Sequence, residues 1–432
     1  MAYIQRSSFI FLAGLLIASG TAIGTELTVG RKETNFREHL DYSSPDLIPI
    51  APQRELTDLD RRALKVAWRY IEQNTRGETG LVDSVAGFPS TTMWDQGSYI
   101  FALIGAKKIG LISELEFVSR IERLLLSLEV LPLFDGKLPN KAYDTRTLEM
   151  VNYQNEVSDT GIGWSALDIC RTLMALKALE KESPAHSEIV RRIVRKWNFS
   201  NMASAGELWG AAVIDDEIKY LQEGRLGYEQ YAARAAALWG LDVFEATSAK
   251  RSLDWVTVEG VELPTDTRVS QSFDAISPIL SEPYLLQIFE MGWDRETHLF
   301  ASHVFAAQEN RYRSSGQFTA VSEDHINQDP FFLYSSVYSD GEEWAVVTED
   351  GTSYPQFRTV STKAAFGWDA VFDTNYTSDL VDHVAGTAHP DFGWAAGIFE
   401  LDRELNSVFA LNTNAVIIEA IHFKLLGPMW RY

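Results

Sequence analysis

Apolar residues recur with helical spacing along most of the chain. Ala67, Trp68 and Ile71 would share one face of a first helix, with Thr57 or Asp58 as its N-terminal cap. The same spacing predicts further helices over residues 96–110, 114–130, 161–180, 186–199, 228–246, 281–292, 295–311, 361–372, 377–385, 391–403 and 412–426. The sequence therefore predicts about twelve helices.

These predicted helices are of two kinds, which alternate along the chain. Those of the first kind are rich in Ala or Gly and apolar nearly all round, and they cover residues 96–110, 161–180, 228–246 and 412–426. Those of the second kind, 114–130 and 186–199, carry stripes of Glu, Arg and Lys. Because a helix that is apolar on all sides is buried and a striped one faces water, we expect an all-α fold, an (α/α)6 toroid of inner and outer helices. Residues 255–269 and 343–348 have an extended pattern and are expected to form small excursions over the ring.

The beginning of the chain differs from the rest. A positive charge near the start, an apolar run over residues 9–18 and small residues behind it predict a signal peptide over residues 1–24. The run is short for a membrane span, and an uncleaved anchor is the alternative. Residues 25–54 are polar and predict an N-terminal arm, and residues 55–432, which have no internal linker, predict a single domain. We therefore expect a secreted, periplasmic protein with no stable membrane span after signal cleavage.

Composition narrows the possible partners. The 38 Lys and Arg residues face 60 Asp and Glu residues, which gives a formal charge of -22. Nucleic acid and other anionic polymers are therefore not expected as partners. Cys170 is the only cysteine, so no internal disulfide is possible, and the eight His residues show no metal-ligand spacing. We expect neither a metal nor another cofactor, and the sequence leaves protein partners unknown.

Acidic residues lie at the predicted starts of the inner helices, and most have an aromatic neighbour. The acidic residues are Asp95, Asp159, Glu229, Glu282 and Asp391. The aromatic residues are Trp94, Trp164, Tyr228, Tyr231, Tyr284 and Trp394. The starts of the inner helices of a toroid converge on one mouth, so we expect these side chains to meet there. A carboxylate at a helix start can also be a simple cap, but a cap has no need of an aromatic partner.

This combination is typical of a site that cleaves sugars. Glycosidic cleavage needs one carboxyl group to protonate the leaving oxygen and another to activate water or attack carbon. We expect Glu229 to be the general acid, because an enclosed position at the start of an apolar helix would raise its pKa. Asp159 is the expected partner, and Asp95 is its rival. Glu282 and Asp391 are expected to bind substrate together with the six aromatic residues.

Two further polar features lie near these positions. Asp168 is expected to be a buried structural carboxylate paired with Arg171 or another cation. Residues 323–330 form a polar segment that could close over the site or be an ordinary surface loop.

Several segments resemble a bacterial family known as domain-of-unknown-function family 3131. They are Thr92-Met93-Trp94-Asp95-Gln96-Gly97-Ser98-Tyr99, Leu138-Pro139-Asn140-Lys141-Ala142-Tyr143, Gly161-Ile162-Gly163-Trp164-Ser165-Ala166-Leu167-Asp168, Leu226-Gly227-Tyr228-Glu229-Gln230-Tyr231-Ala232 and Leu411-Asn412-Thr413-Asn414-Ala415-Val416-Ile417-Ile418-Glu419-Ala420. More remotely, Gly227-Tyr228-Glu229-Gln230-Tyr231 is similar to the Gly-Tyr-Asn-Glu-Tyr segment of glucoamylase-like bacterial β-1,2-glucanases, although Glu229 stands one position earlier than the Glu of that segment. This second resemblance implies an (α/α)6 toroid and a Glu as the acid.

We therefore expect a secreted glycoside hydrolase that acts on a neutral or weakly charged β-glucan or exopolysaccharide by carboxyl acid/base catalysis. Its partner would be a polysaccharide or oligosaccharide. The main alternative is a non-catalytic glycan-binding or assembly factor in polysaccharide export. A structural protein that docks through its polar arm is a third class.

Overall fold

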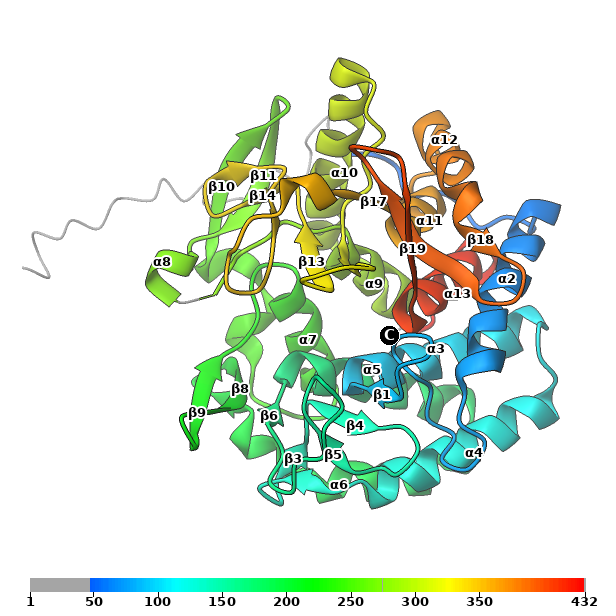
Figure 1. Ribbon diagram of the computed structural model, residues 1–432, viewed down its shortest axis with the longest axis vertical. Coiled ribbons are helices and arrows are strands. Elements are labelled where there is room, and N and C mark those ends of the chain that lie inside the picture. The colour runs from blue at the N-terminus through cyan, green and yellow to red at the C-terminus, as the bar shows by residue number, and fades with distance from the viewer. Residues whose placement is uncertain (1–46, 274, 431–432) are drawn as a thin grey trace, which may run out of the picture. The chain divides into compact units, whose positions relative to one another are not determined.

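Six helices form a closed inner ring in the computed structural model, which describes residues 47–273 and 275–430 (Figure 1). They are α3 (Met93–Ile109), α5 (Ala166–Glu182), α7 (Tyr228–Ala237), α9 (Glu282–Met291), α11 (Thr362–Val371) and α13 (Leu411–Leu426). Each helix contacts the next one in this order, and α13 contacts α3, which closes the ring. In α9 and α11 every residue is buried, and α3 and α13 are buried over most of their length. The all-round apolar pattern therefore predicted four of these six inner helices, α3, α5, α7 and α13, whereas α9 and α11 were predicted as helices without being assigned to the inner layer.

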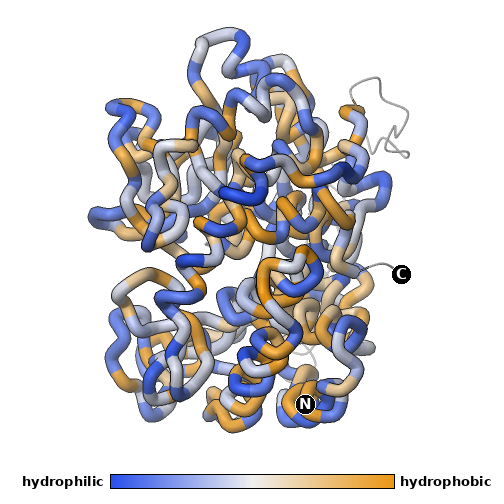
Figure 2. The backbone as a smooth tube through the Cα atoms, turned by 90° about the vertical axis from the view of Figure 1, so that its right-hand side faces the viewer, coloured by the Kyte–Doolittle hydropathy of each residue, from blue (hydrophilic) through white to orange (hydrophobic). Residues whose placement is uncertain are grey.

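Five further helices cover the ring from outside. They are α2 (Asp58–Asn74), α4 (Glu114–Val130), α6 (Ser187–Lys196), α10 (Arg295–Ser315) and α12 (Asn375–Val384). Helix α6 shows why such a helix lies outside: only Val190, Ile193 and Val194 are buried, and Arg and Glu side chains occupy much of the rest of its surface. The hydropathy view shows hydrophilic residues at many of the peripheral turns (Figure 2). The architecture is thus that of an (α/α)6 toroid.

The outer position between α7 and α9 departs from the prediction. A helix was expected over residues 228–246, but α7 ends at Ala237, and Gly240 follows with a left-handed φ of 85°. Two 3-10 turns, the strands β10 (Leu253–Val258) and β11 (Val261–Asp266), and the short helix α8 (Ser270–Phe273) occupy this position. The predicted extended region at 255–269 is confirmed as this antiparallel hairpin, which packs against α10.

Short antiparallel strands precede most of the inner helices. Strand β1 (Ser90–Thr91) leads into α3, β6 (Gly163–Trp164) into α5, β9 (Glu217–Gln222) towards α7, β17 (Thr359–Ser361) into α11 and β20 (Leu405–Phe409) into α13. The other strands are β2 (Leu133–Phe134), β3 (Leu138–Pro139), β4 (Ala142–Asp144), β5 (Met150–Val151), β7 (Ala203–Ser204), β8 (Glu207–Ile214), β12 (Glu323–His325), β13 (Phe332–Ser335), β14 (Tyr338–Ser339), β15 (Glu342–Glu343), β16 (Val346–Val347), β18 (Ala388–His389) and β19 (Gly393–Phe399). The all-α prediction was therefore too simple, because small sheets gather where the inner helices begin.

Residues 391–403 were predicted to be helical, and this was wrong. Their central part is β19, which pairs with β17, β18 and β20. Gly397 allows the close approach to β17, since a Cβ atom there would lie 2.3 Å from the carbonyl oxygen of Val360. The extended pattern at 343–348 is confirmed in β15 and β16.

The predicted signal peptide and most of the predicted arm lie outside the described residues. The described residues belong to one compact unit, Asp46–Tyr432. Within them, no helix combines the length and the apolar character that crossing a membrane requires.

Candidate active site

Every inner helix contributes a polar or aromatic side chain from its first turn to one face of the ring, which we call the mouth site. These side chains are Trp94, Asp168, Tyr228, Glu282, Lys363 and Asn412. The Trp94 and Tyr228 rings meet with their centroids 5.5 Å apart. The Asn412 side-chain amide donates to Glu282 at 2.8 Å, and Lys363 forms an ion pair with the same carboxylate. The starts of the inner helices therefore converge, as the sequence predicted.

A buried charge network supports the mouth site from within the ring. Arg171 of α5 is fully buried and pairs with Glu290 at 3.1 Å and with Glu419 at 3.2 Å. Its guanidinium carbon lies 4.5 Å from the centre of the Trp94 ring. Burial opposes ionisation of Glu282, but Lys363 and Arg171 outweigh it and lower the pKa of this carboxyl group. Glu282 was expected to bind substrate, but it is 1% exposed and is occupied by these internal partners.

Asp168 has a different environment from the one expected. Its side chain is partly exposed, and no Lys or Arg of the described residues lies within ion-pair distance of it, so the expected pairing with Arg171 is wrong. Burial and the negative charges of Glu223 and Asp95 raise the pKa of Asp168 to about 7. A carboxyl group of this kind keeps its proton near neutral pH and still reaches solvent.

Asp95 and Glu223 supply the neighbouring negative charge. Asp95 is 8% exposed and accepts hydrogen bonds from the Ser84 hydroxyl at 2.5 Å and the Thr92 hydroxyl at 2.8 Å. Glu223 follows β9 and accepts from the Ser165 hydroxyl and from the backbone N–H of Ala166, each at 2.6 Å. Glu223 therefore caps α5 from a position far away in the sequence. The sequence analysis missed it because no local pattern marks a cap that comes from another element.

Strand β12 places two more carboxyl groups beside the mouth site. The Tyr228 hydroxyl donates to Glu323, and Asp324 lies 3.7 Å from Lys363. Burial and the charge of Glu282 raise the pKa of Glu323 to about 8, and burial raises the pKa of Asp324 to about 7. Both residues are buried, so the start of the 323–330 segment is neither a lid nor a surface loop. Only residues 327–329 of this segment are exposed.

Glu229 does not have the surroundings of a general acid. It is 3% exposed, and Arg268 donates to both of its carboxylate oxygens, at 3.0 and 2.5 Å. Gln222 donates a further hydrogen bond at 3.0 Å. Burial raises the pKa of Glu229 while Arg268 opposes this effect. A carboxylate that accepts from a guanidinium through both oxygens has no free position for a proton to be donated, so the expected role does not fit this geometry.

Asp159 and Asp391 lie apart from the mouth-site contacts. Asp159 is exposed in a turn before β6, and no hydrogen bond or ion pair links its side chain to the mouth site among the described residues. Asp391 is exposed in the turn between β18 and β19, because the expected helix there is a strand. Neither residue stands at the start of an inner helix.

Four of the six predicted sugar-binding aromatic residues are core residues. Trp164, Tyr231, Tyr284 and Trp394 are at most 5% exposed. The indole of Trp164 donates to the Trp209 carbonyl and that of Trp394 to the Ala63 carbonyl, each at 3.0 Å.

Trp94 and Tyr228 are the two predicted aromatic residues that remain partly exposed. Tyr153 was missed: it is 60% exposed, and partial loss of solvation together with the charge of Asp168 raises the pKa of its hydroxyl group. It lies in a loop, away from the predicted helix starts, so no sequence pattern marked it as a site residue.

The inner ring and the helices that cover it form a fold that is also found in solved structures of glucan-cleaving enzymes. An endo-β-1,2-glucanase from Chitinophaga pinensis, in complex with sophorotriose and glucose, is similar with a TM-score of 0.64 and 13% identity, over 87% of this chain and 94% of that one. An endo-β-1,2-glucanase from Talaromyces funiculosus with sophorose gives a TM-score of 0.58 and 11% identity, over 86% and 84%. A β-1,2-glucanase from Parabacteroides distasonis gives 0.59 and 11%, over 87% of this chain and 58% of that one. These likenesses show that the fold is that of a glucoamylase-like (α/α)6 toroid.

A comparison with models of protein families assigns the chain to one family. The chain belongs to the protein family of unknown function DUF3131, whose sequence model matches residues 62–427. This confirms the resemblance noted from the sequence. No curated protein matches the chain.

Proposed function

We propose that this protein is a secreted, periplasmic glycoside hydrolase that cleaves a β-glucan at the mouth site. The observation that carries the proposal is Asp168, a partly exposed carboxyl group in the first turn of an inner helix with a pKa raised to about 7. A general acid works best when its pKa lies near the working pH. The fold supports the choice of reaction class. Tyr153 lies close enough to Asp168 to feel its charge, and the partly exposed rings of Trp94 and Tyr228 supply further aromatic surface at the mouth site.

In the proposed reaction, Asp168 gives its proton to the glycosidic oxygen as the bond to the anomeric carbon breaks. Asp95 is the second carboxylate and takes a proton from the attacking water. The hydroxyl groups of Ser84 and Thr92 hold the Asp95 side chain in place. Arg171 and Lys363 are already paired with Glu282, Glu290 and Glu419, so they act as supports for the mouth rather than as free cations for a substrate.

A neutral glucan fits the charge of the protein. The chain carries a formal charge of -22, and the negative charges of Glu223 and Asp95 act on Asp168. Anionic chains would therefore be repelled from the mouth. Two of the similar enzymes named above bind sophorose, or sophorotriose and glucose, in their structures, which supports β-1,2-glucan as the first substrate to test.

The test is the release of reducing ends from soluble β-1,2-, β-1,3-, β-1,4- and α-linked glucans by the wild type and by Asp168→Asn. We expect one β-glucan to be cleaved and the variant to be about 10²- to 10⁴-fold slower, the usual contribution of acid/base catalysis. An aryl glycoside with a good leaving group needs little protonation, so Asp168→Asn should lose much less activity on that substrate. Glu229→Gln is the matched control, and we expect it to keep its turnover rate.

Two results would contradict this assignment. If Asp168→Asn keeps full activity while Glu323→Gln loses it, the buried carboxyl group of β12 is the acid. If every glucan stays intact while one of them raises the melting temperature of both proteins, the glycan-binding alternative replaces the hydrolase.

A further inference from the structure

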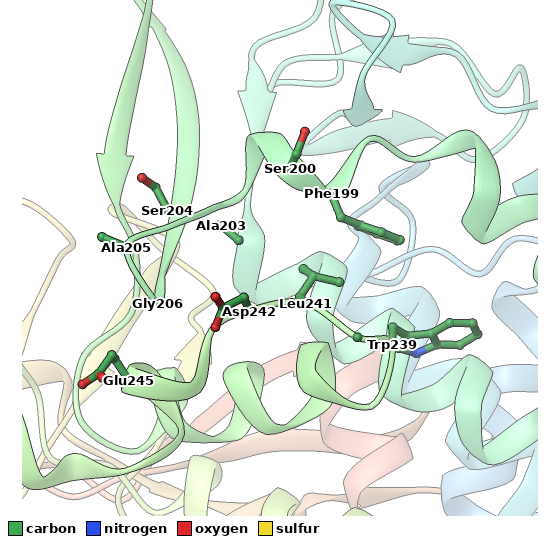
Figure 3. Close-up of a pocket in the computed structure, with 11 residues that line it drawn as sticks. Phe199, Ser200, Ala203, Ser204, Ala205, Gly206, Trp239, Leu241, Asp242 and Glu245 are labelled. Atoms are coloured by element: carbon green, nitrogen blue, oxygen red, sulfur yellow. The ribbon is translucent and has the colours of Figure 1, made fainter.

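A cavity of about 750 Å³ lies between the segment after α6 and the segment after α7 (Figure 3). It contains none of the mouth-site residues, and its α7 side begins at Trp239, beyond the end of the helix at Ala237. Since Tyr228 stands at the other end of this ten-residue helix, the cavity and the mouth are separated by about 15 Å along the helix axis. Its volume is within the range of small-ligand sites, roughly 300–1,000 Å³.

The cavity has an apolar wall and a polar wall. Phe199 and Trp239 lie on one side of the view in Figure 3, and Asp242 and Glu245 lie on the other. The indole of Trp239 is fixed, because its N–H donates to the Leu173 carbonyl at 2.9 Å. A sugar ring has the complementary character, with an apolar face for an aromatic ring and hydroxyl groups for carboxylates.

The charges that line the cavity exclude an anionic ligand. Asp242 is exposed and has no ion pair or hydrogen bond to its side chain within the described part of the chain. The carboxylate of Glu245 is 3.7 Å from Arg251. An anionic ligand would be repelled by these carboxylates. The ammonium group of Lys177 lies 4.0 Å from the centre of the Trp239 ring, where it already takes the place of a cationic ligand on that face of the ring.

We propose that this cavity is an accessory binding site for a neutral glucan chain. The choice of glycan rests on the proposed function, but the site itself does not, because it shares no residue with the mouth. Trp239 and Phe199 pack against the sugar face, while Asp242 accepts hydrogen bonds from hydroxyl groups. Such a site would keep a long chain attached to the protein between cleavage events.

The test uses the full chain with Asp168→Asn as background, so that hydrolysis does not remove the ligand, and with 5-fluorotryptophan at the Trp positions. The fluorine resonance of Trp239 is assigned by its absence in Trp239→Phe. On titration with sophorotriose we expect this resonance to shift. Asp242→Asn should weaken the response about tenfold, the loss expected for one hydrogen bond to a charged group.

Ser200→Trp should abolish the response by filling the cavity, and Asp379→Asn, on the exposed surface of α12, should leave it unchanged. In the otherwise wild-type chain, Ser200→Trp should reduce retention in a gel containing polymeric glucan but not the turnover of short oligosaccharides.

A Trp239 resonance that stays fixed at saturating sugar, or that responds equally in Ser200→Trp, would overturn the accessory site. An equal response to glucosamine oligomers would overturn the assignment to a neutral ligand. The two proposals can fail separately: cleavage without a Trp239 response removes only the accessory site, and a Trp239 response without cleavage of any glucan removes only the hydrolase.

Discussion

Asp168→Asn should make the protein more stable above neutral pH while it removes the proposed activity. The folded protein raises the pKa of Asp168 from 3.8 to about 7. Each pKa unit corresponds to about 1.4 kcal/mol, so this rise of about three units means that ionising Asp168 in the folded state costs roughly 4 kcal/mol. Because the side chain is partly exposed to solvent, we expect a measured effect of about 2 to 4 kcal/mol.

The sign of this effect follows from where the proton is held. Below pH 3.8 the carboxyl group is protonated in both states and changes nothing. Between pH 3.8 and about 7 the unfolded chain loses this proton while the folded protein keeps it, so the wild type loses stability as the pH rises. Above about pH 7 the full cost is present. The Asn side chain is neutral throughout and avoids it.

The assay is denaturant unfolding of the wild type and Asp168→Asn at pH 4, 6 and 8, with Asp379→Asn as an exposed control. The advantage of Asp168→Asn should be small at pH 4 and should grow to its full value at pH 8. An advantage that is independent of pH, or an Asn variant that is less stable at pH 8, would refute the raised pKa. In the same pH range, kcat/KM of the wild type should fall above about pH 7 as the acid loses its proton.

Three other substitutions separate support from catalysis. Glu229→Gln should lower the free energy of unfolding by about 1 to 3 kcal/mol, because the partly buried Arg268 keeps only part of its pairing. It should leave kcat unchanged, and a loss of kcat in a folded variant would restore the role predicted from the sequence. Trp164→Ala should cost about 3 to 5 kcal/mol in thermal or chemical unfolding, as for other fully buried aromatic residues; a stable variant with weakened sugar binding would show that this ring is a subsite. Asp95→Asn should move the alkaline limb of the kcat/KM profile to lower pH, because a negative charge that raises the pKa of Asp168 is removed. If the limb stays in place in a variant with residual activity, Asp95 is too far from Asp168 to affect its pKa.

Much of the inner ring could be predicted because a helix that is buried on all sides has apolar residues on all sides. Helices such as α3 and α13 are buried over most of their length, so they have no polar stripe, whereas the outer helices α4 and α6 do have one. The same signal fails where a short strand is buried on both faces. Residues 393–399 are Gly-Trp-Ala-Ala-Gly-Ile-Phe, an apolar run that reads equally well as a buried helix or a buried strand.

The individual roles of the acidic residues could not be predicted in the same way. Glu229 and Asp168 both stand in the first turn of an apolar inner helix, and nothing in the adjacent sequence distinguishes them. The difference comes from Arg268, which lies outside both helices and pairs with Glu229 alone. For Asp168, the deciding neighbours are the charges of Glu223 and Asp95, which come from two other elements.

The position of a residue in its helix was therefore more informative than its local motif. The first turns of α3, α5, α7, α9, α11 and α13 together supply every member of the mouth site, including Lys363 and Asn412, which have neither an acidic group nor an aromatic ring and were passed over. The ring brings these turns together, and the ion pairs behind them then decide which carboxyl group is fixed in place and which one keeps an exchangeable proton. Glu282 is an example of the first kind, since Lys363 and Arg171 hold it ionised. Asp168, which forms no ion pair within the described part of the chain, is of the second kind, and the proposed chemistry follows from that difference.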